Sequence, residues 1–121
     1  MTGGMDLIKA ERQRQIEQEG WTPEHDDQHY WRELVTAAGC YVGEKNPWPW
    51  PDSPPKLGDA QRNYTKAGAL LLAEIDRLNR ASERANSHKL LARLHKLIED
   101  TEDRLAWVVK KLDGKIASTT T

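Results

Sequence analysis

Apolar residues recur at alternating steps of three and four in the second half of the chain. One run extends from Tyr64 to Leu78 and a second from Leu91 to Leu112. This heptad-like spacing predicts helices that pack along their length against another helix. The polar stretch at 81–87 leaves two alternatives open: an antiparallel helical hairpin, or one continuous helix that pairs with a second subunit.

The first half of the chain predicts two further helices with thinner apolar faces. Residues 6–19 contain neither Pro nor Gly, and Gly20 followed by Pro23 predicts where this helix ends. We expect a second helix from Asp27 or Gln28, capped by Asp26 or Asp27, to about Val42. Its inner face is expected to be formed by Tyr30, Leu34, Ala37, Ala38 and Tyr41.

A loop rich in proline and tryptophan separates the two halves. Five of the six prolines lie between residues 47 and 55, where Trp48 and Trp50 also occur. Because helices and central strands do not accommodate this many prolines, we expect an ordered loop of polyproline character. Its indoles either plug the helical core or stack on a ligand. A third helix is expected to start at Asp59 or Asn63.

These patterns together predict an all-α protein, a small bundle of about four helical segments with a long, coiled-coil-like C-terminal helix. We expect residues 1–5 to be a disordered lead, 6–80 the helical core, 81–114 the C-terminal helix ending at Gly114, and 115–121 a loose tail. Only 37% of the residues are hydrophobic, so the core is modest. We therefore expect a homo-oligomer that buries part of the last helix between copies.

Composition narrows the function classes. A formal net charge of −1 argues against binding extended nucleic acid through a broad positive surface. The single cysteine, Cys40, excludes an internal disulfide and a cysteine-based zinc site. The sequence shows neither a signal peptide nor a long apolar run, so we expect a cytoplasmic protein without a membrane partner.

The turn after the first predicted helix concentrates titratable groups. His25, Asp26, Asp27 and His29 lie close together where the backbone is free to aim them. We expect the aspartates to cap the second helix and His25 to form a hydrogen bond to the first. An alternative is a zinc site that uses His25, His29 and an aspartate. The acidic run at 99–103 also permits a metal site, although such runs are usually a solvated face.

Cationic and aromatic side chains near this turn indicate a site for an anionic, base-containing ligand. Arg62 and Lys66 lie one turn apart near the start of the third predicted helix, where the helix dipole favours a phosphate. The alternative is that Arg62 pairs with Asp59 while Lys66 lies in solvent. The full predicted ligand site consists of Arg12, Arg14, Trp21, His25, Trp48, Trp50, Arg62 and Lys66.

An ordered set of motifs resembles a family of small proteins from tailed phages and prophages. The motifs are ERQRQ at 11–15, EGWTPEHDDQH at 19–29, Glu33-Leu34, Ala37-Ala38 with Cys40-Tyr41, Trp48-Pro49-Trp50, and KAGALLLAEIDRL at 66–78. The resemblance covers roughly residues 6–80 and implies a location in the cytoplasm of an infected bacterial host. Leu91-Ala92-Arg93 and Trp107 with Lys110 and Leu112 more weakly resemble the helical hairpin of phage proteins that sequester nucleotide immune signals.

These resemblances favour one function and leave an alternative. The favoured function is to bind a cyclic or other small nucleotide signal without cleaving it, with no catalytic residue and no cofactor. The alternative is similarity to all-α MazG-type pyrophosphohydrolases, which hold magnesium with Glu-Glu-x-x-Glu and Glu-x-x-Asp on neighbouring helices. This chain has a lone Glu33 and a Glu74-x-Asp76 spacing, which departs from that pattern.

Overall fold

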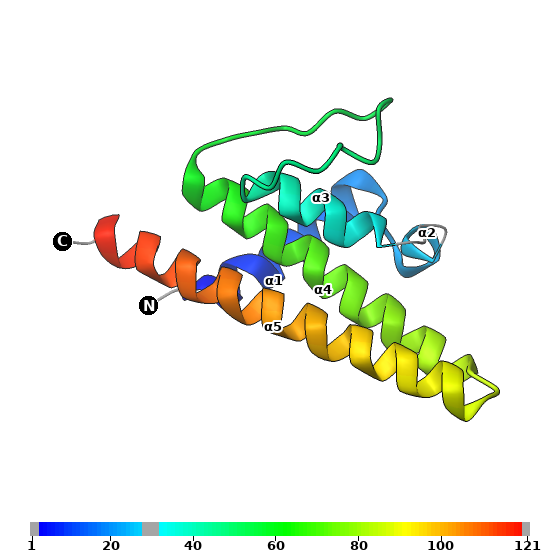
Figure 1. Ribbon diagram of the computed structural model, residues 1–121. Helices are drawn as coiled ribbons and strands as arrows, with labels where there is room; N and C mark the ends of the chain where they lie inside the picture. The colour runs from blue at the N-terminus through cyan, green and yellow to red at the C-terminus, as the bar shows by residue number, and fades with distance from the viewer. Residues whose placement is uncertain (1–2, 28–31, 120–121) are drawn as a thin grey trace.

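The computed structural model describes residues 3–27 and 32–119, which contain helices and no strands (Figure 1). The helices are α1 (Gly4–Glu19), α2 (Pro23–Asp26), α3 (Glu33–Tyr41), α4 (Ala60–Arg84) and α5 (His88–Thr119). The predicted fold class, a small all-α bundle with a Pro/Trp-rich loop, is confirmed. Among the described helices, none combines the length and the apolar character needed to cross a membrane.

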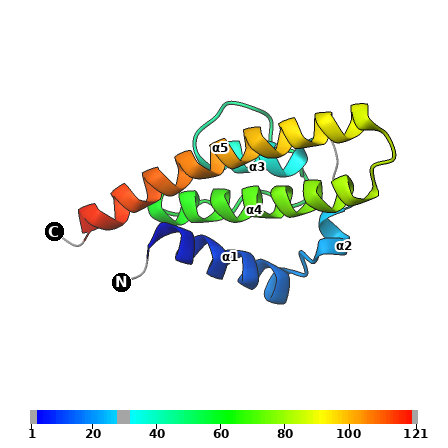
Figure 2. The same cartoon turned by 90° about the horizontal axis from the view of Figure 1, so that it is seen from below.

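Helix α4 is the centre of the bundle. The other four helices all contact it, and the two views show α5 running along its length with α1 and α3 on other sides (Figures 1 and 2). The buried positions of α4 include small residues, namely Ala67, Gly68, Ala69 and Ala73. Because small side chains leave room for a neighbouring backbone, several helices can approach α4 closely.

The second half of the chain is an antiparallel hairpin. Helix α4 continues to Arg84, and the chain reverses at 85–87, where the Ser87 hydroxyl accepts a hydrogen bond of 3.1 Å from the Leu90 amide. Of the two alternatives, the continuous helix is therefore wrong. Leu105, Val108 and Leu112 are buried in the core of their own chain. The apolar run that suggested oligomerisation therefore packs against helices of its own chain. The homo-oligomer stays a prediction.

The ends of α1 and α5 extend further than expected. Helix α1 begins at Gly4, within the predicted disordered lead, and its Gly4 amide donates a hydrogen bond of 2.7 Å to the Asp113 carboxylate of α5. Helix α5 passes through Gly114 to Thr119, so the predicted end at Gly114 was wrong. A glycine inside a helix costs only about 1 kcal/mol, which the neighbouring turns can offset. The first and last described residues lie at the same end of the bundle (Figure 2).

The second predicted helix begins later than expected. Arg32 has a left-handed backbone with φ of 66°, so α3 starts only at Glu33 and has no side-chain cap. Asp26 instead lies buried within α2, and Asp27 forms an ion pair of 2.8 Å with Arg80 of α4. The prediction that these aspartates cap the second helix was wrong, because Arg32 occupies the N-cap position of α3 and no side chain caps it. Residues 28–31, which include the predicted face residue Tyr30, lie outside the described part of the chain.

Other helix boundaries follow the sequence rules. Helix α1 ends at Glu19, and Gly20 is its C-cap. The Gly20 backbone has a φ of 71°, a left-handed conformation that glycine adopts without strain. Helix α4 begins after Asp59, whose carboxylate accepts a hydrogen bond of 2.8 Å from the Arg62 amide. Both boundaries were predicted because a single residue type determines each of them.

Two glycine substitutions test the close approach of α1 to α4. A Cβ atom at Gly68 would lie 2.3 Å from Cδ1 and 2.6 Å from Cγ1 of Ile8, which is fully buried. Because neither side chain can move into open space, Gly68→Ala should destabilise the fold by about 1–3 kcal/mol. A Cβ at Gly114 meets nothing within 4 Å. Gly114→Ala should therefore stabilise α5 by about 0.5–1 kcal/mol. Urea unfolding of both variants measures the difference, and equal effects would contradict the packing described.

Candidate functional site

A cavity of about 250 Å³ lies between α1, the end of α3, the Pro/Trp-rich loop and α4. Helix α1 contributes Glu11, Arg14, Gln15 and Glu19, and Trp21 follows it. The remaining wall comes from Tyr41, Trp48, Trp50, Lys56, Lys66 and Leu70, with Ser53 and Pro54 at the loop. The cavity therefore joins a polar helix face to an aromatic wall.

The aromatic wall consists of rings in edge-to-face contact. The Trp48 and Trp50 rings are 5.3 Å apart at 86°, and Tyr41 lies 5.6 Å from Trp48 at the same angle. Trp21 completes the group, with its ring 6.1 Å from that of Trp50. These separations are typical of stabilising aromatic pairs. The predicted packing of the Trp48–Trp50 loop on the helices is thus present, and the rings also border the cavity.

Hydrogen bonds hold the loop in place. The Trp50 indole donates to the Glu33 carboxylate at 2.7 Å, and the Trp48 indole donates to the Ser53 carbonyl at 2.8 Å. The Lys56 amide donates to the Tyr41 hydroxyl at 3.2 Å. Both indole N–H groups are therefore used in fixing the loop, and the ring surfaces are what the tryptophans can offer a ligand.

The polar wall on α1 is organised around the Glu11 carboxylate, which is 3% exposed. Arg14 donates two hydrogen bonds to it, at 2.8 and 2.9 Å, and Arg62 of α4 forms an ion pair with it at 2.7 Å. Burial by itself raises the pKa of Glu11, but the hydrogen bonds from these two arginines outweigh it and the pKa lies below its ordinary value. Glu11 is therefore ionised at neutral pH.

Lys66 is the cation at this cavity that remains available for an anion. Its ammonium group donates to the Lys56 carbonyl and lies 5.7 Å from the centre of the Tyr41 ring. Among the described residues, no carboxylate forms an ion pair with it. Burial and the nearby charge of Arg62 lower the pKa of Lys66. An anion bound beside Lys66 would oppose both causes and raise the pKa again, because a nearby negative charge favours the protonated ammonium group.

Gln15 is a site residue that the sequence reasoning missed. Its side chain is 2% exposed, its Nε2 donates to the Glu11 carboxylate at 3.4 Å, and its Oε1 accepts no hydrogen bond from the described residues. Glu11, Glu19 and Tyr41 were missed as well. A usable signal was the four-residue spacing of Glu11, Gln15 and Glu19, which puts three polar residues on one face of α1.

The structure brings together five of the eight predicted ligand-site residues. Arg14, Trp21, Trp48, Trp50 and Lys66 line the cavity. Arg62 is adjacent but is engaged by Glu11, a partner that neither sequence alternative named. Arg12 does not line the cavity, and the side chain of His25 lies outside the described part of the structure.

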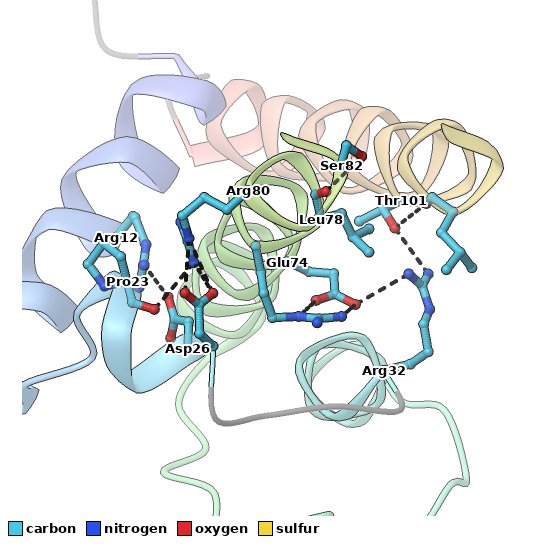
Figure 3. A network of polar contacts seen from close by, with 12 residues as sticks. Arg12, Pro23, Asp26, Arg32, Glu74, Leu78, Arg80, Ser82 and Thr101 are labelled. Atoms are coloured by element: carbon cyan, nitrogen blue, oxygen red, sulfur yellow. Dashed lines mark hydrogen bonds and ion pairs between the residues drawn. The ribbon is translucent and has the colours of Figure 1, made fainter. Parts of the chain in front are cut away.

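Arg12 belongs to a buried charge cluster instead (Figure 3). Its guanidinium donates to the Asp26 carboxylate and, at 3.0 Å, to the Trp21 carbonyl. Both Arg12 and Asp26 are at least nine-tenths buried, so this pair fixes α2 against α1. The phosphate role predicted for Arg12 is therefore replaced by a structural one.

A second buried charge cluster surrounds Glu74 of α4 (Figure 3). Arg77 donates to the Glu74 carboxylate at 2.6 and 3.1 Å, and Arg32 donates to it at 3.3 Å. Arg32 also donates to the Thr101 hydroxyl at 3.0 Å, and this hydroxyl donates a hydrogen bond of 2.7 Å to the Leu97 carbonyl. Thr101, the polar residue within the second apolar run, thus joins α5 to Arg32, which in turn pairs with Glu74 of α4.

Two of the carboxylates considered for metal binding, Glu33 and Glu74, are engaged by other side chains. Glu33 accepts from Trp50, and Glu74 is enclosed by arginines. Within residues 3–27 and 32–119, no group of three or more His, Cys, Asp or Glu side chains is placed to hold a metal ion. The zinc alternative includes His29, which lies outside these ranges.

No model of a known protein family, no curated protein and no solved structure matches this chain. The phage-family resemblance therefore remains a prediction, and the geometry of the cavity is the available guide to function.

The two aspartates of the turn should differ sharply in their contribution to stability. Asp26→Ala leaves the buried Arg12 without its carboxylate, which should cost about 3 kcal/mol or more. The Asp27–Arg80 pair is partly exposed on both sides, so Asp27→Ala should cost less than about 1 kcal/mol. Chemical unfolding measures both values. Equal losses near 1 kcal/mol would restore the helix-cap interpretation.

Proposed function

We propose that this protein binds a small nucleotide in the cavity between α1 and the Pro/Trp-rich loop and holds it without cleaving it. The observation that carries the proposal is the composition of the cavity wall. Four aromatic rings border one side, and Lys66, a cation without a carboxylate partner among the described residues, borders the same space. Ring surfaces stack on a base, and an ammonium group pairs with a phosphate.

The size of the cavity supports a small ligand. Its volume of about 250 Å³ lies just below the usual range of ligand pockets, roughly 300 to 1,000 Å³. One nucleotide unit, or one half of a cyclic dinucleotide, suits such a space. A larger signal would leave its second half outside the described cavity, where a further subunit of the predicted homo-oligomer would cover it.

The biological purpose in the proposal comes from the sequence resemblance. A phage protein that binds a nucleotide immune signal and does not cleave it would act as a sponge in the cytoplasm of the infected host. The described residues support this reading over hydrolysis because the cavity offers one unpaired cation and two arginine-bound carboxylates, Glu11 and Glu19. Carboxylates engaged in this way are poorly placed to gather magnesium ions.

A panel of nucleoside mono- and triphosphates, cyclic mononucleotides and cyclic dinucleotides tests the proposal. Each ligand is incubated with the protein, with and without Mg²⁺, and then analysed by calorimetry and chromatography. We expect at least one ligand to bind and to return intact after heat denaturation of the protein. A new monophosphate product would support the pyrophosphohydrolase alternative, and a complete lack of binding would refute the proposal.

Lysine and arginine variants locate the phosphate. Lys66→Ala should weaken the bound ligand by about 1.5–3 kcal/mol, the usual contribution of a charge-assisted hydrogen bond. Arg62→Ala should have a smaller direct effect, since Glu11 already occupies Arg62. Lys96→Ala is the matched control, because Lys96 lies on α5 and pairs only with Asp100 at 3.2 Å among the described residues. If Lys66→Ala and Lys96→Ala bind equally well, the phosphate is held elsewhere.

A further inference from the structure

We infer that Gln15 selects the ligand by accepting a hydrogen bond from an amino group on its base, so that adenine and cytosine bind in preference to their oxo counterparts. This inference rests on the proposed nucleotide function and adds a specificity-determining residue to it. The observation is a buried acceptor at the cavity wall: Gln15 is 2% exposed, lines the cavity, and has an Oε1 that accepts no hydrogen bond from the described residues.

A buried acceptor without a partner costs free energy in the empty protein. Such atoms are therefore rare unless a ligand or water supplies the donor. Gln15 lies on α1 and lines the same cavity as the four aromatic rings. A base that stacks on one of these rings can therefore present its edge to Gln15.

The neighbouring carboxylate determines which end of the Gln15 amide is available. Arg14 and Arg62 keep Glu11 ionised, so the Glu11 carboxylate can only accept hydrogen bonds. The NH₂ group of Gln15 must therefore face Glu11, because the reverse orientation would place two acceptors against each other. The amide oxygen is then the end of the Gln15 amide that lacks a donor, and a base that enters beside Gln15 can supply one.

This orientation predicts which bases are favoured. Adenine and cytosine carry an exocyclic NH₂ donor where hypoxanthine and uracil carry a carbonyl acceptor. A carbonyl facing Gln15 Oε1 would leave two acceptors in contact, whereas an amino group would satisfy the buried oxygen. A site that requires a donor rejects ligands that lack it more strongly than an apolar pocket rejects an extra methyl group.

Calorimetry with matched nucleotide pairs tests the inference. The pairs are AMP with IMP, cyclic AMP with cyclic IMP, and CMP with UMP. We expect the amino member of at least one purine pair to bind about tenfold or more tightly than the oxo member in the unmodified protein. If both members bind equally well, the inference fails while the proposed function stands. If no nucleotide binds, the proposed function fails and the inference fails with it.

One variant and a matched control test whether Gln15 causes the preference for amino bases. Gln15→Met, which keeps the length of the side chain and removes the acceptor, should bring the two members of each pair within about twofold. Gln13→Met makes the same substitution at an exposed position of α1, where Gln13 contacts Glu17, and should retain the full preference.

A substitution at Glu11 tests whether this carboxylate orients the Gln15 amide. It remains informative even if the Gln15→Met variant does not fold. Glu11→Gln leaves Gln15 in place but removes the carboxylate that orients its amide. The amino preference should fall in this variant. A preference that survives Glu11→Gln or Gln15→Met unchanged would overturn the inference, because another group would then be reading the base.

Discussion

The contact between Ile8 and Gly68 is the constraint on which the rest of the arrangement depends. It allows α1 to lie close against α4, since a side chain at position 68 would overlap Ile8. One and two turns further along α1, Glu11 and Gln15 then face the same cavity as Lys66 of α4. A wider separation of the two helices would place these polar groups in solvent, where they would neither be buried nor meet a common ligand.

Buried charge pairs join the segments that surround the modest apolar core. Three buried carboxylates, Glu11, Asp26 and Glu74, are each bound by at least one arginine from another part of the chain. Such pairs contribute less to net stability than apolar packing does, but breaking one is costly because it leaves an unpaired buried charge. They therefore specify which segments meet. In this chain they direct α2 to α1, α4 to α1, and the start of α3 to α4.

The sequence was sufficient for features that local chemistry determines. The hairpin seam, the Gly20 cap and the Asp59 cap each depend on one residue type or one periodicity. It was insufficient where partners come from distant positions. Asp26 has the local pattern of a helix cap, and only the fold shows that Arg12 binds it. Likewise, the aromatic residues of the site were recognisable, whereas Gln15 became significant only through its burial beside Glu11.

The hydrogen bond between the Gly4 amide and Asp113 has a consequence for synthesis of the chain. It joins residues 109 positions apart, so the first turn of α1 receives its cap only after almost the whole of α5 has been made. Residues are added in order during synthesis, so this hydrogen bond can form only after Asp113 has been made. The residues that line the cavity all lie between Glu11 and Leu70, so the cavity wall can assemble before α5 and only the first turn of α1 depends on it.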